Sequence, residues 1–100
     1  MVKNMIYNFR KEELNMETRV AVISIIVENP ASVELLNTIL HDYSQYIIGR
    51  MGVPYRQKNI NIISIAIDAP QDKISSLAGK IGKLEGVSAK TAFSGVKSDE

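Results

Sequence analysis

Residues 20–27 read VAVISIIV and residues 60–68 read INIISIAID, and these two stretches decide the fold. Both are rich in valine and isoleucine, whose β-branched side chains favour strands. Neither approaches the roughly 20 apolar residues that cross a bilayer, and the N-terminus lacks the apolar core of a secretory signal. We therefore expect two buried strands and no membrane partner.

The segment between these strands carries a helix signal and a weaker strand signal. Asn29 and Pro30 provide an N-cap and a first-turn proline. Apolar residues then recur at helical spacing and predict a helix over residues 31–45. Residues 47–56 form an extended segment that contains two glycines and a proline, and residues 57–59 form a polar turn.

A second helix and a last strand follow. Ala69 and Pro70 open the helix, and Gly86 stands where a C′ glycine ends one. Residues 88–96 predict the final strand. Two β-α-β halves with right-handed crossovers make an α+β, ferredoxin-like βαββαβ sandwich, a four-stranded antiparallel sheet with two helices on one face. The first and third strands are expected in the centre, and the proline-bearing second strand at an edge.

The chain has 100 residues, the length of one domain. We assign residues 18–96 to this domain and residues 97–100 to a polar tail. Residues 1–17 are an N-terminal extension without sustained periodicity. One interpretation is that they form a flexible tail or a short helix. The other is that they are an artefact of a wrongly assigned start site. In the second case translation begins at Met16, because Lys11-Glu12-Glu13 is what a ribosome-binding sequence would read if it were translated.

Composition removes several classes of function. Cysteine is absent, which excludes thiolate metal sites and cysteine nucleophiles and fits a cytoplasmic protein. Twelve basic and eleven acidic residues leave no basic excess for a nucleic-acid partner. His41, the only histidine, shares a polar helix face with Asn37, so we expect a solvated side chain. We expect no metal, no cofactor and no enzyme activity, and we assign Gly79 and Gly82 to close helix packing.

One face of the predicted sheet is too apolar for water. Two helices cover only one face, and a solvated second face should carry polar residues. A second subunit is the favoured cover, giving a homo-oligomer (dimer or tetramer). The alternative is that residues 1–15 fold back over the face. The candidate oligomer-face residues are Val22, Ser24, Ile26, Ile62, Ser64 and Ala66.

The second extended segment is the candidate ligand site. By strand alternation Arg50 and Arg56 point to the same side, where forked donors hold a carboxylate or phosphate. The alternative is edge protection by bulges and charges, and a third interpretation combines an oligomer contact with a small-molecule cleft. The candidate ligand-binding or interface residues are Gly49, Arg50, Met51, Gly52, Pro54, Tyr55 and Arg56, with Asn29 and Pro30.

A family resemblance rests mainly on the string Gly49-Arg50-Met51-Gly52-Val53-Pro54-Tyr55, which Arg56 follows. The other segments that carry it are Ile25–Pro30, Ile63-Ser64, Gly79-Lys80-Ile81-Gly82 and Gly86-Val87. The chain resembles the small bacterial family of iron-only hydrogenase system regulators over about residues 18–96. The resemblance implies an ACT-like domain, similar to the C-terminal domain of nickel-responsive repressors, in an anaerobic bacterium. Two departures limit what the resemblance implies. Ala31 follows Pro30 where amino-acid-binding ACT domains usually have a glycine, which argues against ordinary amino-acid binding. Nickel-responsive repressors use several histidines, so the single His41 does not support nickel sensing.

Two functions follow as hypotheses. The first is a non-enzymatic, self-associating regulatory or sensing module that holds a small anionic effector or a hydrogenase-system protein near residues 49–56. The second is a structural or assembly factor for the hydrogenase system with no small ligand.

Overall fold

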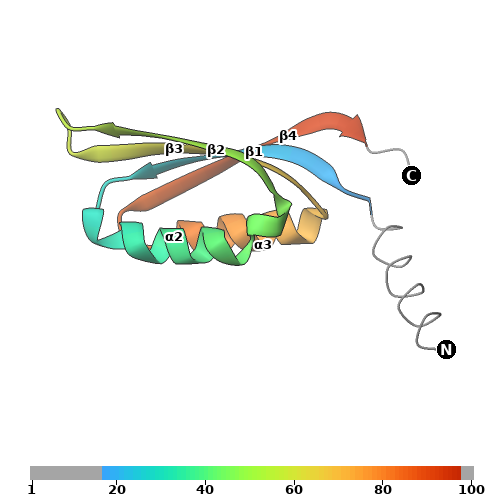
Figure 1. The fold of residues 1–100 in the computed structure, drawn as a ribbon, viewed down its shortest axis with the longest axis horizontal. Helices are drawn as coiled ribbons and strands as arrows, with labels where there is room; N and C mark the ends of the chain where they lie inside the picture. Colours follow the sequence, from blue (N-terminus) through green and yellow to red (C-terminus); the bar gives the residue numbers. More distant parts are fainter. Residues whose placement is uncertain (1–16, 98–100) are drawn as a thin grey trace.

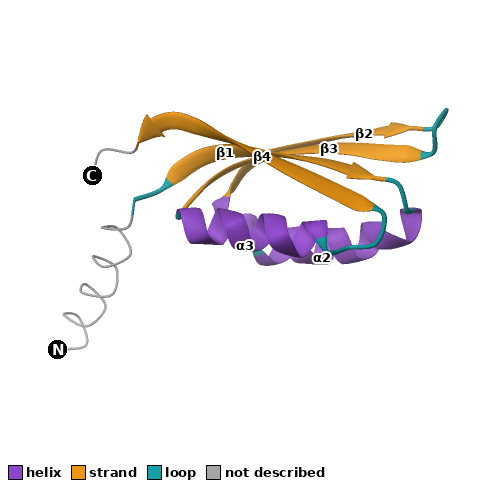
Figure 2. Cartoon of the chain, turned by 180° about the vertical axis from the view of Figure 1, so that it is seen from behind, coloured by secondary structure: helices purple, strands orange, loops and turns teal. Residues whose placement is uncertain are grey.

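The computed structural model describes residues 17–97 and shows a two-layer α+β domain (Figure 1). Both helices lie against the same face of the sheet, and the other face carries no layer in either view (Figures 1 and 2). The elements are β1 (Arg19–Val27), η1 (Pro30–Ser32), α2 (Val33–Asp42), η2 (Ser44–Tyr46), β2 (Ile47–Tyr55), β3 (Ile60–Ala69), α3 (Gln71–Gly82) and β4 (Val87–Lys97).

The sheet is antiparallel with the order β2-β3-β1-β4. The ferredoxin-like prediction is therefore confirmed, with the two most β-branched strands in the centre and the proline-bearing strand at an edge. Strand bounds differ from the predicted ones by no more than one residue at either end.

The core lies between the helices and the sheet face that they cover. Alternate residues of β1 and β3 point into it, and one stripe of each helix packs against them. Ile23, Ile65 and Leu77 are fully enclosed. Ser32 is the buried polar residue of the described chain, and its hydroxyl donates to the Glu85 carbonyl at 2.7 Å. That bond joins the start of the first helical segment to the loop before β4.

The single helix predicted over residues 31–45 is wrong in its extent. It is divided into a 3-10 turn, the α-helix α2 and a second 3-10 turn. The backbone of Tyr43, at φ −109° and ψ 14°, leaves the α region and ends α2. The Asn29 side chain caps the first 3-10 turn as predicted, because it accepts from the Ala31 N–H at 3.0 Å.

Two glycine assignments also need correction. α3 ends at Gly82, so Gly86 is not its C′ residue. Gly86 instead adopts φ +69° in the following loop, where a Cβ would lie 2.6 Å from the Asn29 Cβ. Gly79 and Gly82 were expected to permit close helix packing, yet nothing beyond the adjacent backbone of α3 itself lies within 4 Å of a Cβ built at either position.

Candidate functional site

The sheet face without helices, here called the open face, gathers all six candidate oligomer residues. Strand register places Ile26 beside Ile62, Ser24 beside Ser64 and Val22 beside Ala66. Ile26 and Ile62 are 41% and 43% exposed in the single chain. The neighbouring Ile25, Val27 and Ile63 are buried, because successive residues of a strand point to opposite faces.

The edge strand β2 extends the open face beyond what the sequence assigned to it. Val53 pairs with Ile62, Met51 with Ser64, and Tyr55 with Ile60. Val53 is 48% exposed and continues the apolar row formed by Ile26 and Ile62. Three adjacent strands therefore present large apolar side chains on one side of the sheet.

The same strand sends Arg50 to the opposite side. Arg50 pairs with Ile65, a core residue, so its side chain leaves β2 toward the helices. There the Arg50 Nη2 donates to the Oδ1 of Asn37 on α2 at 2.7 Å. The register also shifts between Ile47 and Gly49, the bulge that a glycine within a strand indicates.

The structure does not bring Arg50 and Arg56 together. β2 ends at Tyr55, so Arg56 belongs to the turn, and the alternation that placed both arginines on one side does not reach it. About 20 Å of extended chain separates the two residues, at roughly 3.3 Å per residue. Tyr55 belongs to the open face, and its hydroxyl donates to the Gln57 side chain. The predicted cluster is divided among three places.

The remaining candidate residues have local roles in the backbone. Gly52 is in ordinary contact with Ile63, 3.8 Å from where its Cβ would lie, and Pro54 pairs with Asn61 on the edge strand. Asn29 and Pro30 form the capped 3-10 turn and do not line a cleft with Arg50.

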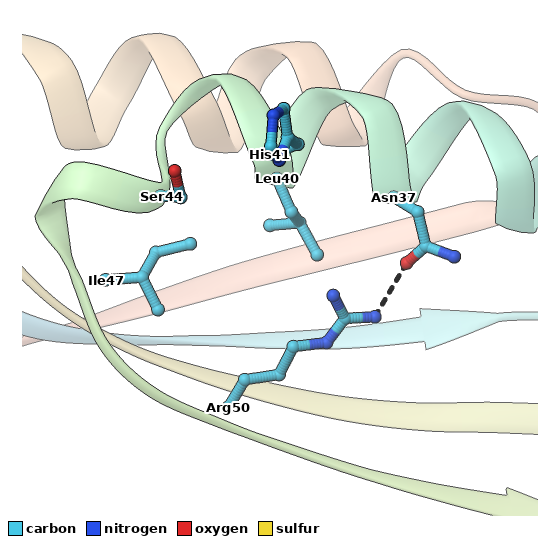
Figure 3. A pocket seen from close by; sticks show the side chains of 6 residues that line it. All are labelled: Asn37, Leu40, His41, Ser44, Ile47 and Arg50. Atoms are coloured by element: carbon cyan, nitrogen blue, oxygen red, sulfur yellow. Dashed lines mark hydrogen bonds between the residues drawn. The ribbon is translucent and has the colours of Figure 1, made fainter.

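A cleft of about 320 Å³ lies between α2, η2 and β2 (Figure 3). Strand alternation alone did not reveal this site, because half of its lining comes from α2, including Asn37 and His41 on the helix face that was expected only to be wet. A helical i, i+4 pair, Asn37 and His41, could have indicated it once β2 was placed beside that helix. The lining residues are Asn37, Leu40, His41, Ser44, Ile47 and Arg50.

A separate polar contact joins the two helices. The Tyr43 hydroxyl lies 2.8 Å from the Ser76 hydroxyl, and the Lys80 Nζ lies 5.1 Å from the Tyr43 ring centre. The hydrogen bond with Ser76, followed by the effect of Lys80, lowers the pKa of Tyr43 below 10.0, although burial opposes the shift. This group does not line the cleft, and we assign it to helix packing.

Among residues 17–97, no three histidine, cysteine or acidic side chains gather as metal ligands would. The same part of the chain contains no helix of the length and apolarity required for a membrane span.

Comparison with known proteins agrees with the sequence resemblance. Residues 19–91 match the model of the family described as "TM1266-like: Iron-only hydrogenase system regulator, putative". The structure of an uncharacterized Thermotoga maritima protein, TM1266, is similar with a TM-score of 0.73 and 32% identity, over 76% of this chain and 96% of that one. No curated protein matches the chain. The resemblance drawn from the Gly49–Tyr55 string is confirmed.

Proposed function

Because the chain belongs to the iron-only hydrogenase system regulator family, we propose that it is a non-enzymatic regulatory module that works as a homo-oligomer. The observation that carries the proposal is the open face. Leaving its apolar side chains in water is unfavourable by roughly 25 cal/mol per Å², and large exposed apolar patches mark interaction sites. A second copy presents a face of the same character.

Regulation requires a signal, and a small anionic effector bound near β2 is the signal that we propose. An effector shifts an equilibrium between subunit arrangements only if it binds one arrangement more tightly than another. Arg50 on the helix side and Met51 on the open face are successive residues of β2. A ligand that moves this strand therefore acts on both faces of the sheet edge.

Light scattering on gel-filtered protein tests self-association. We expect the wild-type chain at two or four times 11.1 kDa. The double change Ile26→Lys with Ile62→Lys places two charges on the open face and should give a monomer. The matched control is Leu35→Lys on α2, where the leucine is 58% exposed away from that face. A wild-type monomer, or equal dissociation by the control, contradicts the proposal.

A shortened chain that starts at Met16 distinguishes the two ways in which the open face could be covered, by a second copy or by residues 1–15. If a second copy covers it, the shortened chain keeps its oligomeric mass. If instead residues 1–15 cover it, their removal creates a new association or precipitation that the full chain lacks.

The alternative function is an assembly factor for the hydrogenase system with no small ligand. Co-purification from an anaerobic host, followed by mass spectrometry of small molecules and proteins, separates the two. A small molecule that co-purifies with the wild-type chain and not with the Arg50→Ala variant supports sensing. A bound hydrogenase-system protein without any small molecule supports assembly.

A further inference from the structure

The cleft between α2 and β2 has a lining with one chemical character. Its four polar residues, Asn37, His41, Ser44 and Arg50, all carry N–H or O–H donors. None of the six lining residues is acidic. The space therefore offers donors and one fixed positive charge, with no carboxylate of its own.

The arginine in this cleft makes a side-chain hydrogen bond to α2. The side-chain Oδ1 of Asn37 accepts from one terminal nitrogen of Arg50 at 2.7 Å, and the other terminal nitrogen lies on the Leu40 side (Figure 3). A guanidinium carries five donors in a planar fork, so this bond leaves most of them available. Asn37 thus acts as a positioning residue for Arg50.

Beside the guanidinium, toward the helix, the cleft is apolar. Leu40 is buried and Ile47 is half-buried, and both side chains extend into the space between helix and strand (Figure 3). The volume, about 320 Å³, lies at the lower end of small-molecule pockets. A ligand with one anionic end and a short apolar body matches both parts of this lining.

We propose that this cleft binds a small organic monocarboxylate. The carboxylate meets the free donors of Arg50, and the apolar body lies on Leu40 and Ile47, while His41 and Ser44 line the helix side of the cleft. The inference rests on the proposed regulatory function and names the effector class and its site. One guanidinium matches one negative charge, and the apolar floor favours a hydrocarbon body over inorganic phosphate.

The main rival explanation is that Arg50 only protects the edge strand from pairing with another sheet. Arg56 provides the control, because it carries the same charge in the turn after the same strand and does not line the cleft. If the arginines only protect the edge strand, removal of Arg50 and removal of Arg56 should have the same effect on the binding of a dissolved carboxylate. The proposed site does.

The test is a titration of the ¹⁵N-labelled full chain, followed by NMR, with isovalerate as the probe. Isopentylamine, a cation with the same hydrocarbon body, and inorganic phosphate are titrated in parallel. We expect saturable shifts at the amides of the cleft with isovalerate. Arg50→Ala should weaken binding about tenfold or more, because a charge-assisted, forked hydrogen bond is lost.

Two further variants sharpen the result. Asn37→Asp supplies an internal carboxylate to Arg50 and should compete with the probe, also weakening it at least tenfold. Thr38→Asp adds the same charge one residue along α2 without lining the cleft and should change binding less than twofold. Arg56→Ala should behave likewise. Spectra that are unchanged outside the cleft show that each variant is folded.

Three results overturn the proposal: no saturable shift with isovalerate, equal loss in Arg56→Ala and Arg50→Ala, or tighter binding of phosphate or amine. The oligomeric mass is measured on the same samples. An oligomer that does not bind isovalerate contradicts only the effector site. A monomer that binds isovalerate contradicts the self-association and leaves the site standing.

Discussion

The same substitution, glycine to alanine, should have opposite effects at Gly86 and Gly79. Gly86 has φ +69°, and a Cβ there lies 2.6 Å from the Asn29 Cβ and 3.0 Å from the Asn29 nitrogen. The left-handed conformation alone costs an L-residue about 1–2 kcal/mol. Relief of the contact requires the loop before β4 to move away from the end of β1.

That movement endangers a backbone hydrogen bond. The Glu28 N–H donates to the Gly86 carbonyl at 2.7 Å, and such a bond contributes about 1 kcal/mol. Gly86→Ala should therefore lower the free energy of unfolding by about 2–3 kcal/mol. In a domain of this size the melting temperature should fall by roughly 4–8 °C for each kcal/mol lost.

Gly79 lies inside α3 with φ in the ordinary range and nothing within 4 Å of a built Cβ. Alanine is better than glycine in a helix by about 1 kcal/mol, so Gly79→Ala should stabilise the protein by about that amount.

Urea unfolding at one fixed protein concentration measures both variants, since association adds to apparent stability. Equal signs, or a Gly86→Ala loss under about 0.5 kcal/mol, the range of an ordinary surface change, would refute the reasoning.

Four further changes test the packing. Ser32→Ala should cost about 1–3 kcal/mol in urea unfolding, because it leaves the Glu85 carbonyl without its donor; a neutral change would show that this bond does not hold the two loops together. Tyr43→Phe removes a phenol whose pKa in the folded state lies below 10.0. Between that pKa and pH 10 the folded state binds fewer protons at this group than the unfolded state does. The stability of the wild type should therefore rise relative to that of the variant as the pH increases through that pKa, and the gain should be complete above pH 10. Unfolding free energies at about pH 8 and 10.5 check this sign, and a difference that shrinks with pH contradicts it. Ile65→Ala should lower the free energy of unfolding by about 2–5 kcal/mol, because it leaves a cavity in the core. Ile62→Ala on the open face should lower the oligomeric mass and should lower the free energy of unfolding less than Ile65→Ala does. Equal losses of unfolding free energy would contradict the assignment of the two faces.

The sheet was predictable because its signals are local and mutually consistent. Alternation in residues 20–27 and 60–68 fixed which side chains enter the core, and the capped Asn29-Pro30 turn fixed the crossover. The helix end at Tyr43 was not visible, since a buried tyrosine interrupts the helix backbone without breaking its apolar stripe.

The candidate site was less predictable because it depends on contacts between elements. Alternation placed Arg50 correctly on a strand, but the end of β2 at Tyr55 removed Arg56 from the same row. Asn37 and His41 are exposed, as expected, yet they border the cleft only because β2 runs beside α2. No spacing within one element carries that information.

The position of β1 has a consequence for how the protein is made. β1 lies between β3 and β4, and Val27 pairs with Val87, 60 residues further along the chain. At about 5–20 residues per second of synthesis, one flank of this apolar strand waits about 3–12 seconds for its partner to be made. During translation, a chaperone or a neighbouring nascent chain has that interval in which to occupy the empty flank.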